Sequence, residues 1–262
     1  MVKASIVIPC KSNELNISRA ISSFAEGELD IEILIGLDGI NEITENIILG
    51  HEFPNIILLK FPEGTGISVI LNSLINRSSG EYIIRMDADD ISYPDRLSFQ
   101  LKLLDRMPNV YMLCGNALNF DRKMIGNGVS RAIKCSELLN LNPVIHPTVV
   151  FRRVIFLPNA LFSYNPKYKK SQDYELWTRI VRKYKIYYDD RVVLNYNSVF
   201  DIKKYSLQHY YFSKAKIKNL LWHVNPIHTC TCSSREIIVA LLRSYEIFTS
   251  YLKVVARYIC EK

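Results

Sequence analysis

Apolar runs of strand length alternate with stretches of helical periodicity along the first 200 residues. The runs are continuously apolar, which is typical of strands that are buried on both faces of a parallel sheet. The stretches between them place apolar residues three or four positions apart, as in an amphipathic helix. This order predicts an α/β fold with a doubly wound, mostly parallel central sheet, helices on both faces and a helical C-terminal extension. The expected strands are 5–9, 31–37, 55–59, 82–86, 110–114, 148–151 and 186–196, and the expected helices are 13–24, 42–50, 67–76, 94–106, 171–181, 203–221 and 234–259.

Three acidic residues follow directly after the apolar run 82–86. Asp87 and Asp89 are two positions apart, so in an extended chain their side chains point to the same side. Doubly wound sheets bind ligands beyond the carboxyl ends of their strands, and Pro9 and Asp38 also stand at such ends. Same-facing carboxylates can hold Mg2+ or Mn2+ together with waters and ligand phosphates. The pattern favours a metal and ligand site here, with a solvated turn as the alternative.

Two common nucleotide-binding loops are missing from the sequence. It contains neither the G-x-x-x-x-G-K-[ST] phosphate loop nor a G-x-G-x-x-G motif after the first strand. If a nucleotide binds to this chain, a metal must therefore neutralise much of the charge of its phosphates.

Two further residues are candidates for the second half of a site. His146 lies between Pro143 and Pro147, which predicts extended chain and a place in a pocket wall, with a purely structural histidine as the alternative. Asp173 follows Ser171, a suitable helix cap, and so falls in the first turn of the expected helix. Acidic residues also stabilise helix dipoles in that turn, so Asp173 alone carries little weight.

Taken together and in order, these motifs resemble those of the family 2 glycosyltransferases. The resemblance covers about residues 4–197 and implies an inverting enzyme of the GT-A fold that uses a nucleotide-diphosphate sugar. Cell-surface polysaccharide or lipopolysaccharide assembly is what membership of this family most often implies. The segments that carry the resemblance are 5–9, 37–39, 67–72, 80–90, 94–97, 146–149 and 172–177.

The resemblance implies a role for each candidate residue on the donor side. Asp38 would bind the base of the donor nucleotide, and Pro9 would line the donor pocket. Asp89 would bridge Mn2+ or Mg2+ to the diphosphate, while Asp87 would lie near the ribose as an indirect or second metal ligand.

On the acceptor side, the resemblance makes Asp173 the catalytic base and allows His146 to line the acceptor pocket. The acceptor would be a glycan or a lipid-linked molecule.

Lys11 replaces the tyrosine that usually follows the first strand in this family, and Leu37 replaces an acid. The identity of the nucleotide therefore stays open, with a UDP-sugar favoured. A sugar nucleotidyltransferase and a catalytically silent partner subunit of the same fold are the alternatives. A phosphohydrolase that uses an Asp-x-Asp pair is disfavoured, because its pair belongs to the first strand.

Length and composition are those of an ordinary globular protein. With 262 residues, 48% of them apolar, the chain can bury a sizeable core. We expect a nucleotide-sugar-binding part at 1–115, an acceptor and catalytic-base part at 116–200, and a basic helical extension at 201–262. No apolar run reaches the roughly 18 residues that span a bilayer. The scattered cysteines and the lack of a signal peptide predict a cytoplasmic protein.

The net charge of +7 is concentrated in the C-terminal extension. From residue 200 onward, ten Lys and Arg stand against four Asp and Glu, which leaves the rest of the chain nearly neutral. The segment 234–259 reads as an amphipathic helix with a basic polar face. Such a helix could pack on the body, form a homodimer, or dock on the anionic inner face of a membrane. Nucleic-acid binding is disfavoured, because no known binding module is recognisable.

Overall fold

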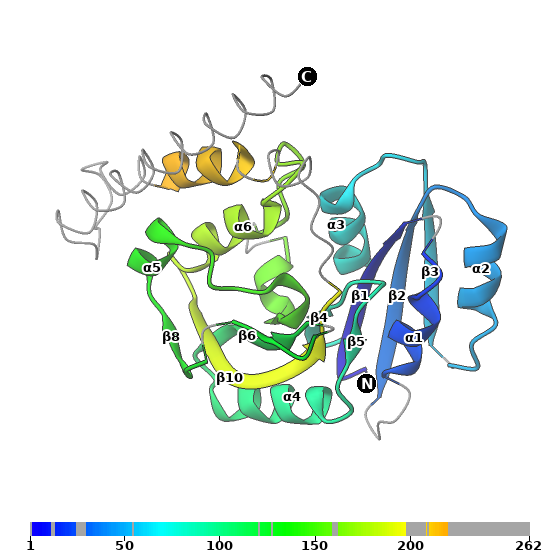
Figure 1. Cartoon of the computed structure of the whole chain (residues 1–262), viewed down its shortest axis with the longest axis horizontal. Coiled ribbons are helices and arrows are strands. Elements are labelled where there is room, and N and C mark those ends of the chain that lie inside the picture. Colours follow the sequence, from blue (N-terminus) through cyan, green and yellow to red (C-terminus); the bar gives the residue numbers. More distant parts are fainter. Residues whose placement is uncertain are drawn as a thin grey trace.

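The computed structural model describes residues 2–11, 14–24, 30–53, 55–119, 121–126, 128–158, 162–197, 208 and 210–219. Figure 1 shows an α/β fold in which helices flank a central sheet. The strands are β1 (Ala4–Lys11), β2 (Ile31–Asp38), β3 (Ile56–Phe61), β4 (Tyr82–Arg85), β5 (Ile91–Ser92), β6 (Val110–Leu118), β7 (Met124–Ile125), β8 (Arg131–Ile133), β9 (Val150–Arg152) and β10 (Lys185–Asn195). The α-helices are α1 (Ile17–Ser22), α2 (Glu42–Leu49), α3 (Ile67–Arg77), α4 (Arg96–Arg106), α5 (Cys135–Asn140) and α6 (Gln172–Ile180), and the 3-10 helices are η1 (His146–Thr148) and η2 (Arg153–Phe156).

The strands form one sheet in the order β3-β2-β1-β4-β9-β6-β10-β5, with β7 paired to β6 and β8 paired to β10. Strands β3, β2, β1 and β4 are parallel to one another. Strand β9 is antiparallel to both β4 and β6, so β6 and its parallel neighbour β10 run in the same direction as β4. The predicted doubly wound, mostly parallel sheet is therefore confirmed.

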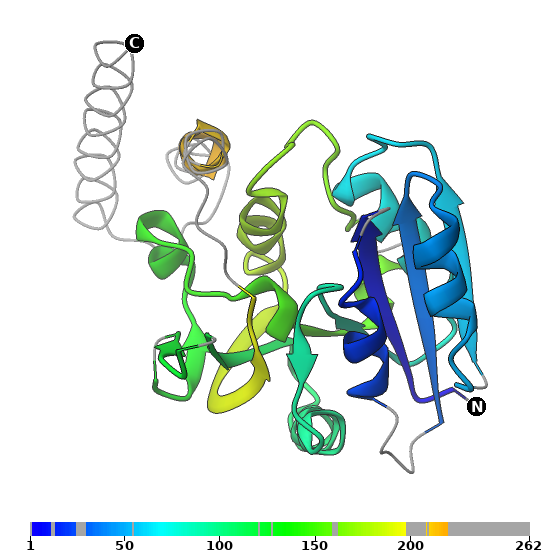
Figure 2. The ribbon, with the colours of Figure 1, turned by 45° about the vertical axis from the view of Figure 1, so that its right-hand side comes forward.

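Helices cover both faces of this sheet (Figures 1 and 2). Buried residues of α1, α2 and α4, among them Ile21, Ile48 and Leu101, share one apolar cluster with one face. Buried residues of α3 and α6, including Leu74 and Trp177, share a second cluster with the other face. The continuously apolar strands of the sequence are explained by this double cover, because a strand between two helical layers buries both of its faces.

Two local predictions differ from the structure. The strand expected at 110–114 continues to Leu118, because β6 is paired on both sides and the buried Asn116 donates a hydrogen bond to the carbonyl oxygen of Asp190 at 2.6 Å. Residues 115–118, for which no strand was predicted, are therefore part of β6. His146, expected in extended chain, begins the 3-10 turn η1, where Pro147 fits because its fixed φ suits the first turn of a helix.

At its C-terminal end the described chain is helical at residues 208 and 210–219, which confirms that part of the helix predicted at 203–221. The helix predicted at 234–259 lies outside the described residues. Among the described residues, no helix has the length and apolar character needed to cross a membrane. The division of the chain at residue 115 stays a prediction about roles, since both parts contribute strands to one sheet.

Candidate functional site

The carboxyl ends of three neighbouring strands meet at one edge of the sheet. Strand β1 lies between β2 and β4, with Lys11 opposite Asp38 and Val7 opposite Arg85 in the two registers. Pro9, near the end of β1, is partly exposed. Asp38 ends β2, and its Oδ1 accepts a hydrogen bond from the backbone N–H of Thr65 at 3.1 Å, in the loop before α3. The topology thus brings together the residues expected on the donor side.

Arg85 is a buried cation next to the acidic cluster, which we define as Asp87, Asp89 and Asp90. It ends β4 two residues before Asp87, and its side chain is only 3% exposed. One terminal nitrogen forms an ion pair with Asp87. Its Nε and its other terminal nitrogen are buried and have no hydrogen-bond partner within the described part of the chain. Sequence reasoning missed Arg85, although its position before Asp87 was a signal, because a charge in an otherwise apolar strand needs a partner.

The acidic cluster holds negative charge that the protein only partly compensates. Burial, and then the charge of Asp87, raises the pKa of Asp89. Asp90 is buried, and its Oδ1 accepts a hydrogen bond from the backbone N–H of Asn197 at 2.8 Å. Its Oδ2 lacks a partner among the described residues, and burial together with Asp87 raises the pKa of Asp90 to about 8.

These hard oxygen ligands fit Mg2+ or Mn2+. Among the described residues no group of three or more His, Cys, Asp and Glu is arranged to hold a metal ion. Asp87 and Asp89 alone would therefore supply only part of the coordination shell of a metal ion. Water or the phosphates of a ligand would complete it, which is the usual arrangement for Mg2+.

Asp173 occupies the first turn of α6, as the sequence predicts. Its Oδ2 accepts a hydrogen bond from the side-chain amide of Asn142 at 3.4 Å. Burial raises the pKa of Asp173, and this effect is partly offset by the backbone N–H of Tyr174 and by the positive charge of Arg85. Ser171 stands at the cap position with φ 53°, but its hydroxyl donates to the carbonyl oxygen of Gln208 at 3.1 Å.

His146 lies against Tyr164, a residue that sequence reasoning did not single out. The His146 Nε2 and the Tyr164 hydroxyl oxygen are 2.8 Å apart, and the His146 ring meets Trp177 edge-on. Burial, and then the charge of Arg85, lowers the pKa of His146, so the ring is neutral at pH 7. Asn72 of α3 holds Tyr164 by two hydrogen bonds of 2.8 Å, one to its carbonyl oxygen and one from its N–H.

The charge of Arg85 influences several of these groups. It acts on Asp87 and also on His146 and Asp173. Tyr196, just beyond β10, is under the influence of the same groups: burial and then the charges of Asp87 and other acids, including Asp173, raise its pKa to about 12. The acidic cluster and Asp173, 84 positions apart along the chain, therefore share one electrostatic environment.

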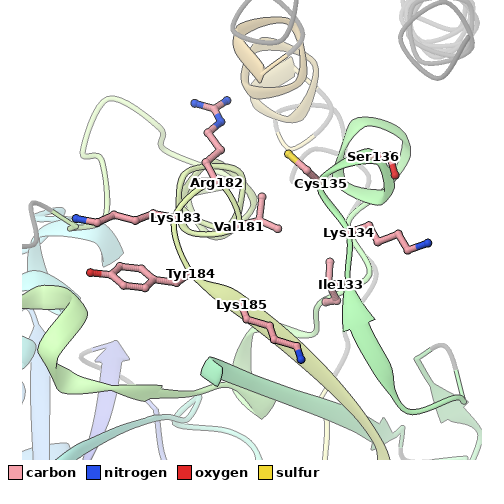
Figure 3. Close-up of a pocket in the computed structure, with 9 residues that line it drawn as sticks. All are labelled: Ile133, Lys134, Cys135, Ser136, Val181, Arg182, Lys183, Tyr184 and Lys185. Carbon is pink, nitrogen blue, oxygen red and sulfur yellow. The ribbon is translucent and has the colours of Figure 1, made fainter. Parts of the chain in front are cut away.

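A separate pocket of about 540 Å³ lies between the start of α5 and the residues after α6 (Figure 3). Several basic side chains line it, but Lys134 and Lys183 point to opposite sides (Figure 3). The pocket contains none of the predicted site residues, because it lies beyond the C-terminal end of α6 and Asp173 stands at the other end of this helix.

The model of the protein family "Glycosyl transferase family 2" matches residues 5–155, which is more than half of the chain. An uncharacterized glycosyltransferase of Rickettsia typhi is 28% identical over 201 residues, and the match covers 72% of this chain and 62% of that relative. The chain thus spans less than two thirds of the length of this relative. An Escherichia coli protein described as UDP-Glc:alpha-D-GlcNAc-diphosphoundecaprenol beta-1,3-glucosyltransferase WfgD is 27% identical over 219 residues, covering 82% of this chain and 81% of that protein.

Two solved structures share the fold. The structure of S. aureus TarS 1–349 in complex with UDP-GlcNAc superposes with a TM-score of 0.72 at 13% identity, covering 95% of this chain and 73% of that one. The mannosyltransferase PcManGT from Pyrobaculum calidifontis, in complex with GDP-Man and Mn2+, superposes with a TM-score of 0.62 at 13% identity, covering 98% and 79%. The arrangement of strands and helices is therefore that of known GT-A glycosyltransferases.

Proposed function

The chain belongs to glycosyl transferase family 2, as its motifs predicted, and on this premise we propose that it transfers a sugar from a nucleotide-diphosphate sugar to a hydroxyl group of a glycan or lipid-linked acceptor. The transfer inverts the anomeric centre. The observation that carries the proposal is the convergence of an acidic cluster at the end of β4 and a carboxylate at the start of α6 around the buried cation Arg85.

The edge formed by β1, β2 and β4 is the donor side. Asp38, fixed by the N–H of Thr65, binds the base of the nucleotide, and Pro9 lines the pocket. Asp87, held by Arg85, lies near the ribose. Asp89, with Asp87 as an indirect or second ligand, would hold Mn2+ or Mg2+, and a bound cation of this kind stabilises the charge that develops on a leaving diphosphate. The structure of PcManGT, which shares the fold and is in complex with GDP-Man and Mn2+, supports this assignment.

Asp173 is the proposed catalytic base. It accepts the proton of the acceptor hydroxyl while that oxygen attacks the anomeric carbon and the bond to the diphosphate breaks on the opposite face. General-base catalysis of this kind contributes roughly 10²–10⁴-fold. The raised pKa of Asp173 suits the role, because it makes the ionised carboxylate a stronger base at neutral pH than an ordinary aspartate. His146 and Tyr164 form the acceptor-side wall, where the neutral imidazole adds no charge.

The relatives support particular substrate classes. The name of WfgD specifies a UDP-Glc donor and a lipid-diphosphate acceptor, and TarS has been crystallised with UDP-GlcNAc. We therefore favour a UDP-sugar as donor and a polyprenyl-diphosphate-linked glycan as acceptor. Docking of the basic C-terminal extension on the inner face of a membrane fits this acceptor, and a homodimer formed through the extension is the alternative.

A ligand panel followed by a transfer assay tests the proposal. Thermal unfolding of the full chain is measured with UDP-, GDP- and dTDP-sugars, each with and without Mn2+. A ligand that binds only the folded protein raises its Tm. We expect one class of nucleotide sugar to do so in a Mn2+-dependent manner, and to be consumed when a lipid-diphosphate sugar is added.

Stabilisation by a nucleotide sugar without transfer to any acceptor or to water would favour a silent partner subunit. If no nucleotide sugar stabilises the protein, the proposed function is wrong.

A further inference from the structure

Helix α6, which carries the proposed base, is buried on nearly all sides. Seven of its nine residues are buried. One side, including Trp177 and Ile180, packs into the apolar cluster beneath the sheet. Further contacts come from the C-terminal strap, which we define as Gln208 and the helix 210–219, and which lies next to α6 (orange in Figure 1).

The strap contacts α6 along its whole length. At the start of α6, the hydroxyl of Ser171 donates to the carbonyl oxygen of Gln208 at 3.1 Å. One turn further, the Tyr174 and Phe212 rings stack with their centroids 4.4 Å apart. Beyond the end of α6, a terminal nitrogen of Arg182 donates to the side-chain oxygen of Asn219 at 2.6 Å.

A buried carboxylate joins the strap to the first turns of α6. The side chain of Glu175 is only 2% exposed, and Lys218 of the strap binds its Oε1 at 3.0 Å. Arg179, one turn along α6, binds its Oε2 at 3.0 Å. The backbone N–H of Glu175 donates to the carbonyl oxygen of Ser171 at 3.1 Å. Glu175 is thus tied both to the strap and to the turn that contains Asp173, two residues before it.

We propose that the C-terminal strap positions the base, with Lys218 acting as a positioning residue that holds the first turn of α6 through Glu175. This inference rests on the proposed role of Asp173. The family match ends at residue 155 and includes neither α6 nor the strap. The placement of the base therefore depends on a contact that the matched part of the chain does not supply.

The physical reason lies at the start of α6. Ser171 has a left-handed backbone conformation, which L-residues adopt only where their surroundings hold them. Contacts of the strap on both sides of Asp173 provide this hold. Without them the first turn can relax, and a displacement of a reacting group by about 1 Å can lower the rate of a reaction about 100-fold.

The test compares two lysine substitutions on the same helix of the full chain. Lys218→Met removes the ion pair between the strap and Glu175 and leaves that with Arg179, and Lys214→Met removes an equal charge one turn away that lies over the Tyr168 and Tyr211 rings. We expect Lys218→Met to lower kcat about tenfold with an unchanged KM for the nucleotide sugar, and Lys218→Arg to restore kcat. Lys214→Met is expected to leave both constants within twofold of wild type.

Two further measurements separate positioning from general loss of structure. Hydrogen exchange should be faster at residues 172–177 in Lys218→Met and unchanged there in Lys214→Met. Adding Glu175→Gln to Lys218→Met should lower kcat no further than the larger single effect, because residues that act through one contact are not additive.

Wild-type kcat and wild-type exchange in Lys218→Met would overturn the positioning role while leaving the proposed function intact. Absence of transfer by the wild-type protein with every donor and acceptor would instead overturn the proposed function. The exchange measurement still tests the hold of Lys218 on α6 in that case, because it needs no activity.

Discussion

Replacing Asp173 by Asn should abolish transfer and at the same time make the protein more stable at neutral pH. Burial raises the pKa of this carboxyl group in the folded protein more than the Arg85 charge and the neighbouring N–H groups lower it. The folded state therefore binds the proton more tightly than the unfolded state does. Between the ordinary aspartate pKa of about 4 and the raised folded value, stability falls as the pH rises.

The magnitude follows from this linkage. Each unit by which the pKa is raised destabilises the ionised folded protein by about 1.4 kcal/mol. In a chain of this size, 1 kcal/mol corresponds to a change in Tm of about 2–4 °C. Asparagine has nearly the same shape and no charge, so Asp173→Asn removes the penalty at pH 8. The same change should lower kcat by roughly 10²–10⁴-fold, the usual contribution of a general base, and leave nucleotide-sugar binding intact.

The assay is thermal unfolding at pH 8 and at pH 4, together with kcat at saturating donor. Asp121→Asn, an exposed position, controls for the loss of one negative charge. We expect Asp173→Asn to exceed the wild type in Tm at pH 8 and the difference to shrink at pH 4, because the raised pKa costs less stability as the pH falls towards the ordinary aspartate value of about 4. A variant that is less stable than wild type at pH 8, or one that retains most of its turnover, would refute the reasoning.

Three further predictions concern the other parts of the site. Asp89→Ala should lose the Mn2+-dependent part of the increase in Tm caused by a nucleotide sugar, and a Mn2+-dependent increase equal to that of the wild type would contradict its role as metal ligand. Asn72→Ala removes both hydrogen bonds to the Tyr164 backbone and should lower the free energy of unfolding by about 1–3 kcal/mol in urea titrations, with Ser73→Ala at the partly exposed neighbouring residue for comparison. His146→Gln should reduce the loss of stability that the wild type shows between pH 7 and pH 5. A histidine whose folded pKa is lowered contributes stability above its ordinary pKa of about 6.5, and this contribution is lost as the pH falls. If the variant loses as much stability as the wild type over this range, His146 is not the group responsible.

The fold was predictable because its signal is local. The long buried strands are apolar runs and most helices have their own periodicity, so neither requires knowledge of distant residues. The short helix α5 and the two- or three-residue strands β5, β7 and β8 lack such a signal and were not predicted. The acidic residues after β4 were predictable for the same reason, since Asp87 and Asp89 follow directly on such a run. The assignment of roles to the six predicted site residues stays a prediction.

The contacts that complete the site were not predictable, because they join residues that are far apart in the sequence. Asn72 and Tyr164 are 92 positions apart, and neither has a neighbour pattern that reveals the other. Lys218 and Glu175 are 43 positions apart. The 3-10 turn at His146 was missed for a different reason, since two nearby prolines are compatible with both extended chain and a tight turn, and the surrounding packing decides between them.

The hydrogen bond between Asn197 and Asp90 bears on how far the length of the chain between the sheet and the strap can change. The chain passes beside the acidic cluster at residue 197, and by residue 208 it is bonded to Ser171 at the start of α6. The polypeptide is therefore attached beside Asp90 and again, about ten residues later, at the residue that precedes α6. Inserting a few residues between these two attachments would cost little stability, because the entropy of closing a loop grows slowly with its length.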